Sequence, residues 1–544
     1  MRKLYRLSAA VLALLLLGSG VLLSGYAPSD QALEPEPAPA TGWVKDQVLP
    51  VSIEMSEADY EHLMANGTLE QEYPAAVTWD GQALPQVSVR AKGNSSLNSV
   101  ARSENKRYSL KLDLNQYIDG QSVGGITTIN LNNSFSDPSF LREYLGYEAF
   151  ASLGVPTPTT TWVELTVNGK LWGLYLAVEQ IGRPFLERNF ADASGALYKP
   201  DGEKSGAGAD LKWRDDSFAS YPGIVYKSGE VSGDHADLIA MLDALNNGGD
   251  LEKHLDVDEI LRYFAASTVM SNFDSYQGTI LHNYYLYEDN GRFTILPWDL
   301  NMSFAGFGMG GGTESQITVK IDEPTMTALA ERPLIAKLLE VPEYVERYHG
   351  FVKELVEGYL NSATFEARAL EVQALLDPFV QRDPTKFVTY EQFKASLEGG
   401  AVAPASGRQQ GGMMGGNAIG LLTFVEERIA NVRQQLDGTL PTKGDGSGMG
   451  ATARGAFRPG QGGAVPGQAE AVPGQGRARP QGQAAQGQFG GQFGDRPGFP
   501  GTEAPGTTSS VSAFGVPVDQ VVPVGVAVLL LVAATGVIWR LRQQ

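Results

Sequence analysis

Asp274, Asn283 and Asp299 are polar residues whose order and spacing could build a metal-assisted catalytic site. Residues 284–296, between the last two, are rich in aromatic and β-branched types around an Asp-Asn-Gly turn at 289–291, which predicts a β-hairpin. A hairpin brings its two ends together, so an amide and a carboxylate would meet there. Magnesium binds hard oxygen ligands and keeps several waters, so these two groups and phosphate oxygens would be sufficient. Asp274 lies just upstream, where it could accept the proton of an attacking hydroxyl.

The length of the hairpin turn decides which way these side chains point. If three residues close the hairpin, Glu288 pairs with Arg292, and Asn283 and Asp299 fall on one face. With a two-residue turn they fall on opposite faces, and both turns fit the sequence. The simpler alternative is that Asp274 and Asn283 bond to loop backbone groups while Asp299 caps the next segment.

Composition excludes several classes of protein. The chain of 544 residues has no cysteine, so its fold stands without disulfides. The formal net charge of −20 lies mainly on the folded part, which argues against nucleic-acid binding and favours a cationic or metal-bridged partner. The five histidines lack metal-ligand spacing, and serine nucleophile elbows and Walker-type P-loops are missing.

Both ends of the chain carry segments that predict export and membrane anchoring. The N-terminus has basic residues before an apolar run, as in a signal peptide or an uncleaved anchor. A Gly, Pro and Gln-rich region predicts a disordered stalk, and an apolar stretch followed by arginines predicts a single-pass helix with a cytoplasmic end. We expect a cell-membrane protein with an extracytoplasmic domain, in the order signal or anchor (1–28), linker (29–44), folded domain (45–437), stalk (438–520), transmembrane helix (521–539) and cytoplasmic tail (540–544).

The folded part reads as strands first and helices later. Apolar residues alternate within 51–114, which predicts β-strands. Residues 138–154 carry an apolar stripe with helix start and stop signals. The pattern is helical from Pro333 through Leu360, again to Leu375, and in a last helix from about Asn417, with a Met- and Gly-rich insert at 409–416 predicted as a surface loop. A Gly-rich stretch, 305–315, predicts a mobile loop. The domain is therefore predicted to be α+β.

Two groups of charged residues could bind an anion. The turn containing Arg90, Lys92 and Asn94 could cradle phosphates with backbone N–H groups and side-chain charge, although the same residues also suit an ordinary turn. In phosphoryl-transfer enzymes a strand lysine paired with a helix glutamate orients ATP.

Lys111 is the candidate for that lysine, and Glu143 or Glu148 for the glutamate. The alternative is that both acids are solvated helix charges of little energetic weight. A second hairpin, turning at Asn168-Gly169, leads directly into Glu179, which in a two-lobed layout would lie at the connection between lobes, beside a nucleotide base.

The ordered motifs RAKGNSS, RYSLKLDLN, DPSFLREYLGYEAFASLGVP, VNGKLWGLYLAVEQI, HNYYLY and ILPWDL resemble the CotH kinase family over residues 45–437. The resemblance implies a bilobal, atypical protein-kinase-like fold with a β-rich N-lobe and a mainly helical C-lobe, and it implies ATP with Mg²⁺ or Mn²⁺ as cofactors. It implies roles for these residues: Asp274 as catalytic aspartate, Lys111 paired with Glu143 on ATP, Asn283 and Asp299 as metal ligands, and Arg90, Lys92, Asn94 and Glu179 at the nucleotide.

One position departs from the family pattern. The family often has a second acid two residues after the aspartate of its WD motif, whereas here Asn301 stands there, so we expect weaker metal affinity. The expected function is that of a surface-anchored kinase that transfers the γ-phosphoryl group of ATP to Ser or Thr of an extracytoplasmic protein. The alternatives are a catalytically inactive surface display or adhesion protein, and an enzyme that transfers the adenylyl group.

Overall fold

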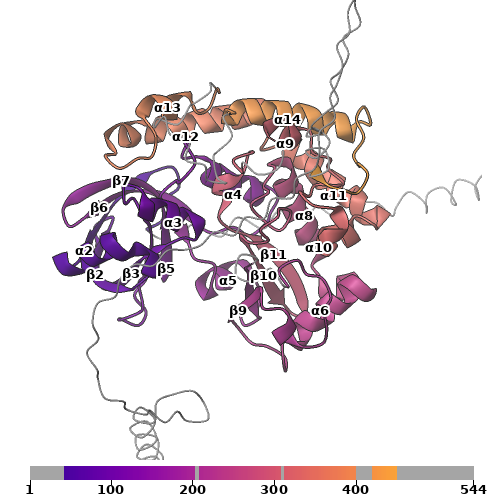
Figure 1. Ribbon diagram of the computed structural model, residues 1–544, viewed down its shortest axis with the longest axis horizontal. Helices are drawn as coiled ribbons and strands as arrows, with labels where there is room; N and C mark the ends of the chain where they lie inside the picture. The colour runs from indigo at the N-terminus through magenta and orange to yellow at the C-terminus, as the bar shows by residue number, and fades with distance from the viewer. Residues whose placement is uncertain (1–41, 202–207, 308–311, 400–418, 450–544) are drawn as a thin grey trace, which may run out of the picture. The chain divides into compact units, whose positions relative to one another are not determined.

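The computed structural model describes residues 42–201, 208–307, 312–399 and 419–449 (Figure 1). The segments predicted as a signal or anchor and as a transmembrane helix lie outside these ranges. Within the ranges, none of the helices combines the length and the apolar character that crossing a membrane requires.

A closed barrel forms the N-terminal part of the fold, and the β-strands predicted within 51–114 are confirmed as part of it. Its strands are β1 (Val48–Glu54), β2 (Tyr73–Trp79), β3 (Gln82–Lys92), β4 (Ser109–Asp113), β5 (Thr128–Asn132), β6 (Thr160–Val167) and β7 (Lys170–Glu179), in the spatial order β1-β2-β3-β4-β5-β7-β6. β1 and β6 pair in parallel, and the other neighbours are antiparallel. β2 buries every second residue, which places one apolar face inside the barrel.

A second, four-stranded sheet has the order β11-β10-β8-β9. Its strands are β8 (Leu197–Pro200), β9 (Ile224–Ser228), β10 (Tyr284–Asp289) and β11 (Arg292–Pro297). The helices are α2 (Glu57–Asn66), α3 (Ser95–Arg102), α4 (Arg142–Ser152), α5 (Arg183–Asn189), α6 (Ala236–Asn247), α7 (Leu251–His254), α8 (Val257–Val269), α9 (Thr313–Ile317), α10 (Pro333–Leu338), α11 (Pro342–Glu357), α12 (Ser362–Arg382), α13 (Tyr390–Ala395) and α14 (Leu421–Leu436), with short 3-10 turns η1 (Gly67–Leu69), η2 (Phe218–Ser220), η3 (Leu300–Met302) and η4 (Leu329–Glu331).

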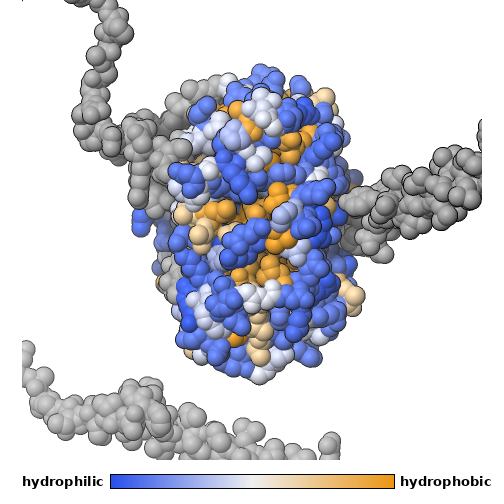
Figure 2. Space-filling view, turned by 90° about the vertical axis from the view of Figure 1, so that its right-hand side faces the viewer, coloured by the Kyte–Doolittle hydropathy of each residue, from blue (hydrophilic) through white to orange (hydrophobic). Residues whose placement is uncertain are grey.

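The fold is therefore a mixed α+β fold, and the predicted helices are confirmed as α4, α10 to α12 and α14. The stretch predicted as a mobile loop at 305–315 is helical in part, because α9 begins within it. Seen from the side of α6, α10 and α11, hydrophilic side chains cover most of the surface, with apolar patches between them (Figure 2). α11 follows this pattern, since Tyr348, Val352 and Leu355 are buried at helical spacing while most of its other residues stay in contact with solvent.

The β6–β7 hairpin separates two large apolar clusters. Trp162 and Leu174 pack with the helices and the second sheet, whereas Val163 and Tyr175 pack inside the barrel. The turn has two residues, Asn168 and Gly169, both with positive φ, as the sequence predicted. Because one hairpin has an apolar side chain on each face, it forms a wall that both clusters share.

A buried ion pair fastens α12 to this wall. Arg107, just before β4, donates to the carboxylate of Asp383 at 2.9 Å, and both side chains are fully buried. Arg107 also donates to backbone carbonyl groups at the ends of β5 and β7. α12 packs beside α14, so the pair joins the C-terminal helices to the barrel (Figure 1).

Candidate active site

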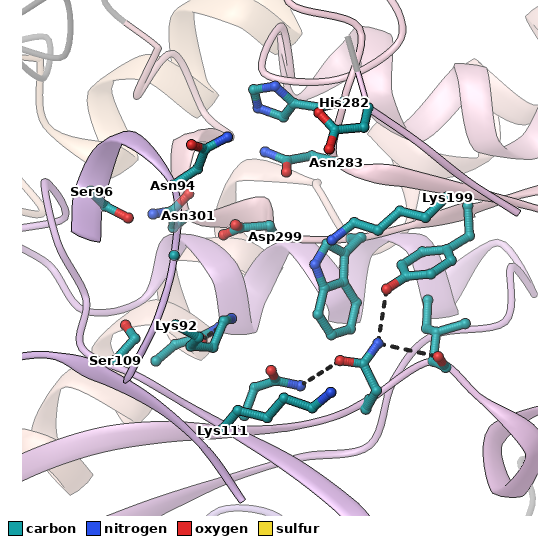
Figure 3. Close-up of a pocket in the computed structure, with 18 of the residues that line it drawn as sticks. Lys92, Asn94, Ser96, Ser109, Lys111, Lys199, His282, Asn283, Asp299 and Asn301 are labelled. Atoms are coloured by element: carbon teal, nitrogen blue, oxygen red, sulfur yellow. Dashed lines mark hydrogen bonds between the residues drawn. The ribbon is translucent and has the colours of Figure 1, made fainter. Parts of the chain in front are cut away.

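A cavity of about 640 Å³ lies between the barrel and the second sheet. Side chains from β3, β4, β5 and α4 line it on one side, and β8, β9 and the residues around the β10–β11 hairpin line the other. Figure 3 shows Lys92, Lys111, Asn283 and Asp299 directed into the same space. The cavity therefore collects polar residues that are far apart in the sequence.

The loop 271–283 joins α8 to β10 and carries Asp274. The Asp274 carboxylate is nearly buried, with His282 Nε2 3.0 Å from Oδ1 and Asn283 Nδ2 donating to Oδ2 at 3.1 Å. Asp274 therefore lines the cavity, and His282 and Asn283 of the same loop hold its carboxylate in place.

Two buried arginines hold this loop from behind. Arg428 of α14 donates to the carbonyl groups of Thr268 and Val269 at the end of α8, where helix carbonyls lack partners within the helix. Arg332 donates to the carbonyl groups of Tyr276 and Gly278. The position of Asp274 thus depends on residues about 60 and 150 positions further along the chain, which local sequence patterns do not reveal.

The turn of the β10–β11 hairpin differs from one of the two sequence alternatives. Asp289 pairs with Arg292, so the turn consists of Asn290 and Gly291, with φ of 52° and 83°. The three-residue turn, with Glu288 opposite Arg292, is wrong. Two successive residues with positive φ define the two-residue turn whose twist matches that of the strands.

Asn283 and Asp299 nevertheless line one cavity. They lie just outside the strands, and both have a left-handed backbone, with φ of 59° and 55°. The alternation of faces applies only within an extended strand. The left-handed residues therefore turn both side chains toward the cavity, where strict alternation would have separated them.

Glu143 is linked to Lys92 rather than to Lys111. Asn132 accepts a hydrogen bond from Lys92 Nζ at 2.9 Å and donates to both oxygens of Glu143, at 3.0 and 2.9 Å. The other candidate, Glu148, pairs with Arg368 at 2.7 Å and with Lys45 at 3.1 Å, away from the cavity. The lysine linked to Glu143 is therefore Lys92, the last residue of β3, and not Lys111 as the sequence suggested.

The charges around this pair shift its ionisation. Burial, and after it the negative charge of Asp299, raises the pKa of Glu143 to about 8. Burial lowers the pKa of Lys92, while the charges of Asp299 and Glu143 act in the opposite direction. Asp299 and Glu143 therefore share the positive charge of Lys92, and an additional cation would stabilise the ionised form of both acids.

The donors present fit a divalent cation of the magnesium type. Asp299 offers a carboxylate, and no hydrogen bond or ion pair to it is found among the described residues. Asn283 uses its Nδ2 to bond Asp274, which leaves its amide oxygen as a possible ligand. Within the described ranges no group of three or more His, Asp or Glu residues could hold a metal by itself, so phosphate and water oxygens would have to complete the shell.

Cationic side chains crowd the same cavity, although the protein is strongly acidic. Burial, and next the charge of Arg90, lowers the pKa of Lys111, and Lys92 and Lys227 act in the same direction. Like charges are held together at a cost unless an anion neutralises them. Among the described residues, the lysines and arginines that line the cavity are Arg90, Lys92, Lys111, Arg183, Lys199 and Lys227.

The predicted phosphate-facing turn also lies at the cavity. Gly93, with φ of 134°, leads from β3 to Asn94, which directly precedes α3, and both residues line the cavity. Helix N-termini present free N–H groups that favour anions. Arg90 is in part neutralised, since it pairs with Glu70.

Glu179 is not brought to the cavity. Its buried carboxylate accepts from the N–H of Thr159 at 3.1 Å and pairs with Arg188. The next residue, Gln180, lines the cavity instead and donates to the hydroxyl of Tyr285 at 2.8 Å. The last residue of β7 and the residue that follows it thus point to different sides.

Sequence reasoning did not single out Trp298. Trp298 lines the cavity, and its ring lies 5.8 Å from Lys92 Nζ and 5.8 Å from Lys199 Nζ, within reach of both cations. Its position beside Asp299 in the chain was the available signal.

Fold and cavity together define a mixed α+β protein that can hold an anionic ligand next to two acidic residues, Asp274 and Asp299. The chain belongs to the CotH kinase protein family, whose model matches residues 89–407, and it is a kinase-like protein. It is 25% identical over 324 residues to the inner spore coat protein H of Bacillus subtilis (strain 168), covering 58% of this chain and 86% of that protein.

A second relative is the inner spore coat protein H-like protein of the same bacterium, 39% identical over 59 residues, which are 11% of this chain and 19% of that protein. Among solved structures, the proinflammatory kinase CtkA of Helicobacter pylori aligns at 11% identity with a TM-score of 0.24, over 61% of this chain and 94% of that chain. The HipA, HipB and operator DNA complex of Shewanella oneidensis MR-1 aligns at 11% identity with a TM-score of 0.21, over 56% and 57%. At these TM-scores neither alignment supports a statement about this protein.

Proposed function

We propose that this protein is an ATP-dependent protein kinase that transfers the γ-phosphoryl group to Ser or Thr hydroxyls of an extracytoplasmic or surface protein. One observation carries the proposal: Asp274 and Asp299 line the same cavity as the linked Lys92 and Glu143. Phosphoryl transfer needs a proton acceptor, cations on the phosphates and a carboxylate for the metal, and the cavity offers all three.

Each residue has a chemical task in this reaction. Lys92 and Lys111 bind the phosphates of ATP, and Glu143 orients Lys92 through Asn132. Asn283 and Asp299 would hold Mg²⁺ or Mn²⁺, which neutralises charge on the phosphates. Asp274 accepts the proton as the acceptor oxygen bonds to the γ-phosphorus and the bond to the departing ADP oxygen breaks. Arg90 and Asn94 face the phosphates, and Gln180 replaces Glu179 at the predicted base-binding position.

The bilobal kinase arrangement and the membrane anchor belong to this proposal as well. The two apolar clusters support two lobes that face each other across the cavity. The predicted span at 521–539 supports a single-pass anchor with a cytoplasmic end, and the acidic net charge supports a partner other than nucleic acid.

Radiolabelled ATP tests the reaction. Full-length protein in detergent is incubated with Mg²⁺ or Mn²⁺, casein and ATP labelled at either the γ- or the α-phosphate. We expect γ-label on protein, and loss of that label in Asp299→Ala with an unchanged circular dichroism spectrum. Transfer of α-label would show adenylyl transfer instead. Absence of both nucleotide binding and transfer would favour a display or adhesion protein that keeps the fold without turnover.

A further inference from the structure

Residues 439–449, here called the C-terminal strap, follow α14 and fold back onto the loop 320–329. Three backbone hydrogen bonds join the two segments: Asp322 N to Thr442 O at 2.9 Å, Leu329 N to Gly446 O at 3.0 Å and Met449 N to Thr325 O at 2.9 Å. The sequence predicted this segment as the start of a disordered stalk, and the family model ends before it. The described strap is instead packed against the domain.

Glu323 binds the strap through the backbone of two glycines. Its nearly buried carboxylate accepts from Gly444 N at 2.8 Å and Gly448 N at 2.7 Å. A Cβ at Gly448, where φ is +69°, would lie 2.0 Å from Thr327 O, whereas one at Gly446, where φ is +84°, would meet nothing within 4 Å. The strap therefore requires glycine at 448 for space, and at 446 only for backbone conformation.

The loop 320–329 touches the loop that carries Asp274. Met326 N donates to Gln277 O at 3.0 Å, and the Gln277 amide donates to Pro324 O at 2.8 Å. Met449 shares a small apolar cluster with Phe273, the neighbour of Asp274, and with Met302. The strap therefore supports the loop 271–283 both through the loop 320–329 and through the apolar cluster around Met449.

We propose that the C-terminal strap positions the loop 271–283, with Glu323 and Met449 as positioning residues for Asp274. Releasing the strap removes Met449 from the cluster and leaves Thr325 without its backbone donor, so the support behind Phe273 and Gln277 weakens. Lys92 and Lys111 lie on the barrel, away from the strap. Release should therefore reduce the turnover number more than it weakens the affinity for nucleotide, to which the loop contributes only through Asn283, an expectation that rests on the proposed kinase function.

Two glycine substitutions in the full-length protein make a matched pair. Asparagine tolerates a left-handed backbone, so Gly446→Asn should be accommodated while Gly448→Asn cannot seat its Cβ. We expect Gly448→Asn to lower kcat about 10-fold, equivalent to about 1.4 kcal/mol, with a smaller change in KM for ATP. Gly446→Asn should match the wild type. Glu323→Gln, which keeps one acceptor and is close in size, should give a smaller loss of kcat and serves if Gly448→Asn does not fold.

Hydrogen exchange of residues 271–278 reports on the strap without any assay of activity. We expect faster exchange there in Gly448→Asn than in Gly446→Asn. Equal exchange in the two variants, faster exchange with a normal kcat, or a parallel change in KM for ATP would each overturn the positioning role. If the wild type transfers no phosphoryl group, the proposed function fails, and the exchange comparison still decides whether the strap supports the loop.

Discussion

Lys92 and Glu143 are joined through the amide of Asn132, which accepts from the ammonium group and donates to both carboxylate oxygens. The arrangement spans β3, β5 and α4, so it fixes a helix charge relative to the barrel. Asp299 lies close enough to both residues to influence their ionisation. The ionisation of Lys92, Glu143 and Asp299 at the centre of the site is consequently interdependent.

The raised pKa of Glu143 predicts stability that falls as pH rises. Its ordinary value is 4.5 and its folded value is about 8, so between these pH values the folded state keeps a proton that the unfolded state releases. Each pKa unit corresponds to about 1.4 kcal/mol, so several kcal/mol of unfolding free energy should be lost across this window. Urea unfolding at about pH 5, 6.5 and 8 measures this loss, and Glu143→Gln should show much less of it than the wild type.

Glu148, on the same helix, provides the control with the opposite sign. Although burial acts to raise its pKa, hydrogen bonding to Arg368 and the charge of Lys45 outweigh burial and lower it. Its stabilising effect is therefore present above the unfolded pKa and is lost as pH falls. Glu148→Gln should destabilise the protein at neutral pH. Identical pH slopes for wild type and Glu143→Gln would contradict the raised pKa of the buried Glu143.

The two cavity lysines should differ in function. Lys92→Met removes the cation that Glu143 orients, so kcat/KM for phosphoryl transfer should fall by about 100-fold or more. Lys111→Met removes one of several like charges, so its effect should be confined to a roughly 10-fold weaker affinity for ATP, about 1.4 kcal/mol. Steady-state kinetics at varied ATP measure both. Equal losses of kcat in the two variants would indicate that Lys111 also orients ATP, as the sequence suggested.

These lysines show which parts of the site local sequence patterns can predict. The strands, the main helices and the two-residue turn at Asn168 follow from alternation and turn chemistry, which are local. The partner of Glu143 does not, because it depends on the register of β3 against β4 and β5 in a closed barrel, where Lys92 rather than Lys111 lies nearest to Asn132. Asn283 and Asp299 come together at one cavity because a hairpin, which is a local structure, joins them, while the positions of Gln180, Trp298 and Arg428 depend on contacts distant in sequence.

Removing the charge of Asp299 should abolish stabilisation by metal. An ion that binds only the folded state raises the melting temperature in proportion to the logarithm of its concentration above Kd. Excess Mg²⁺ or Mn²⁺ with ATP should therefore raise Tm for the wild type and not for Asp299→Asn, as measured by differential scanning fluorimetry. Asp289→Asn, at the opposite end of the same hairpin, should keep the full shift. A preserved shift in Asp299→Asn would place the cation elsewhere.

The buried pair of Arg107 and Asp383 should dominate the stability of the junction between α12 and the barrel. Removing one partner leaves the other charge buried, which costs about 3–5 kcal/mol. Asp383→Asn and Arg107→Met should each lower the unfolding free energy by that amount. Because Asp383 also accepts from Leu174 N at 2.9 Å, the double variant should recover only part of the loss.

Gly173 tests the same junction from the backbone side. A Cβ there would lie 2.1 Å from the Asp383 carboxyl carbon, and its φ of +121° disfavours other residues, so Gly173→Ala should be as destabilising as Asp383→Asn. The exposed pair of Lys337 and Glu340, at 3.0 Å, is the control, since Lys337→Met should cost less than about 1 kcal/mol. Chemical denaturation followed by tryptophan fluorescence measures all of these variants. A loss at Gly173→Ala no larger than that at Lys337→Met would mean that α12 moves aside without breaking the ion pair.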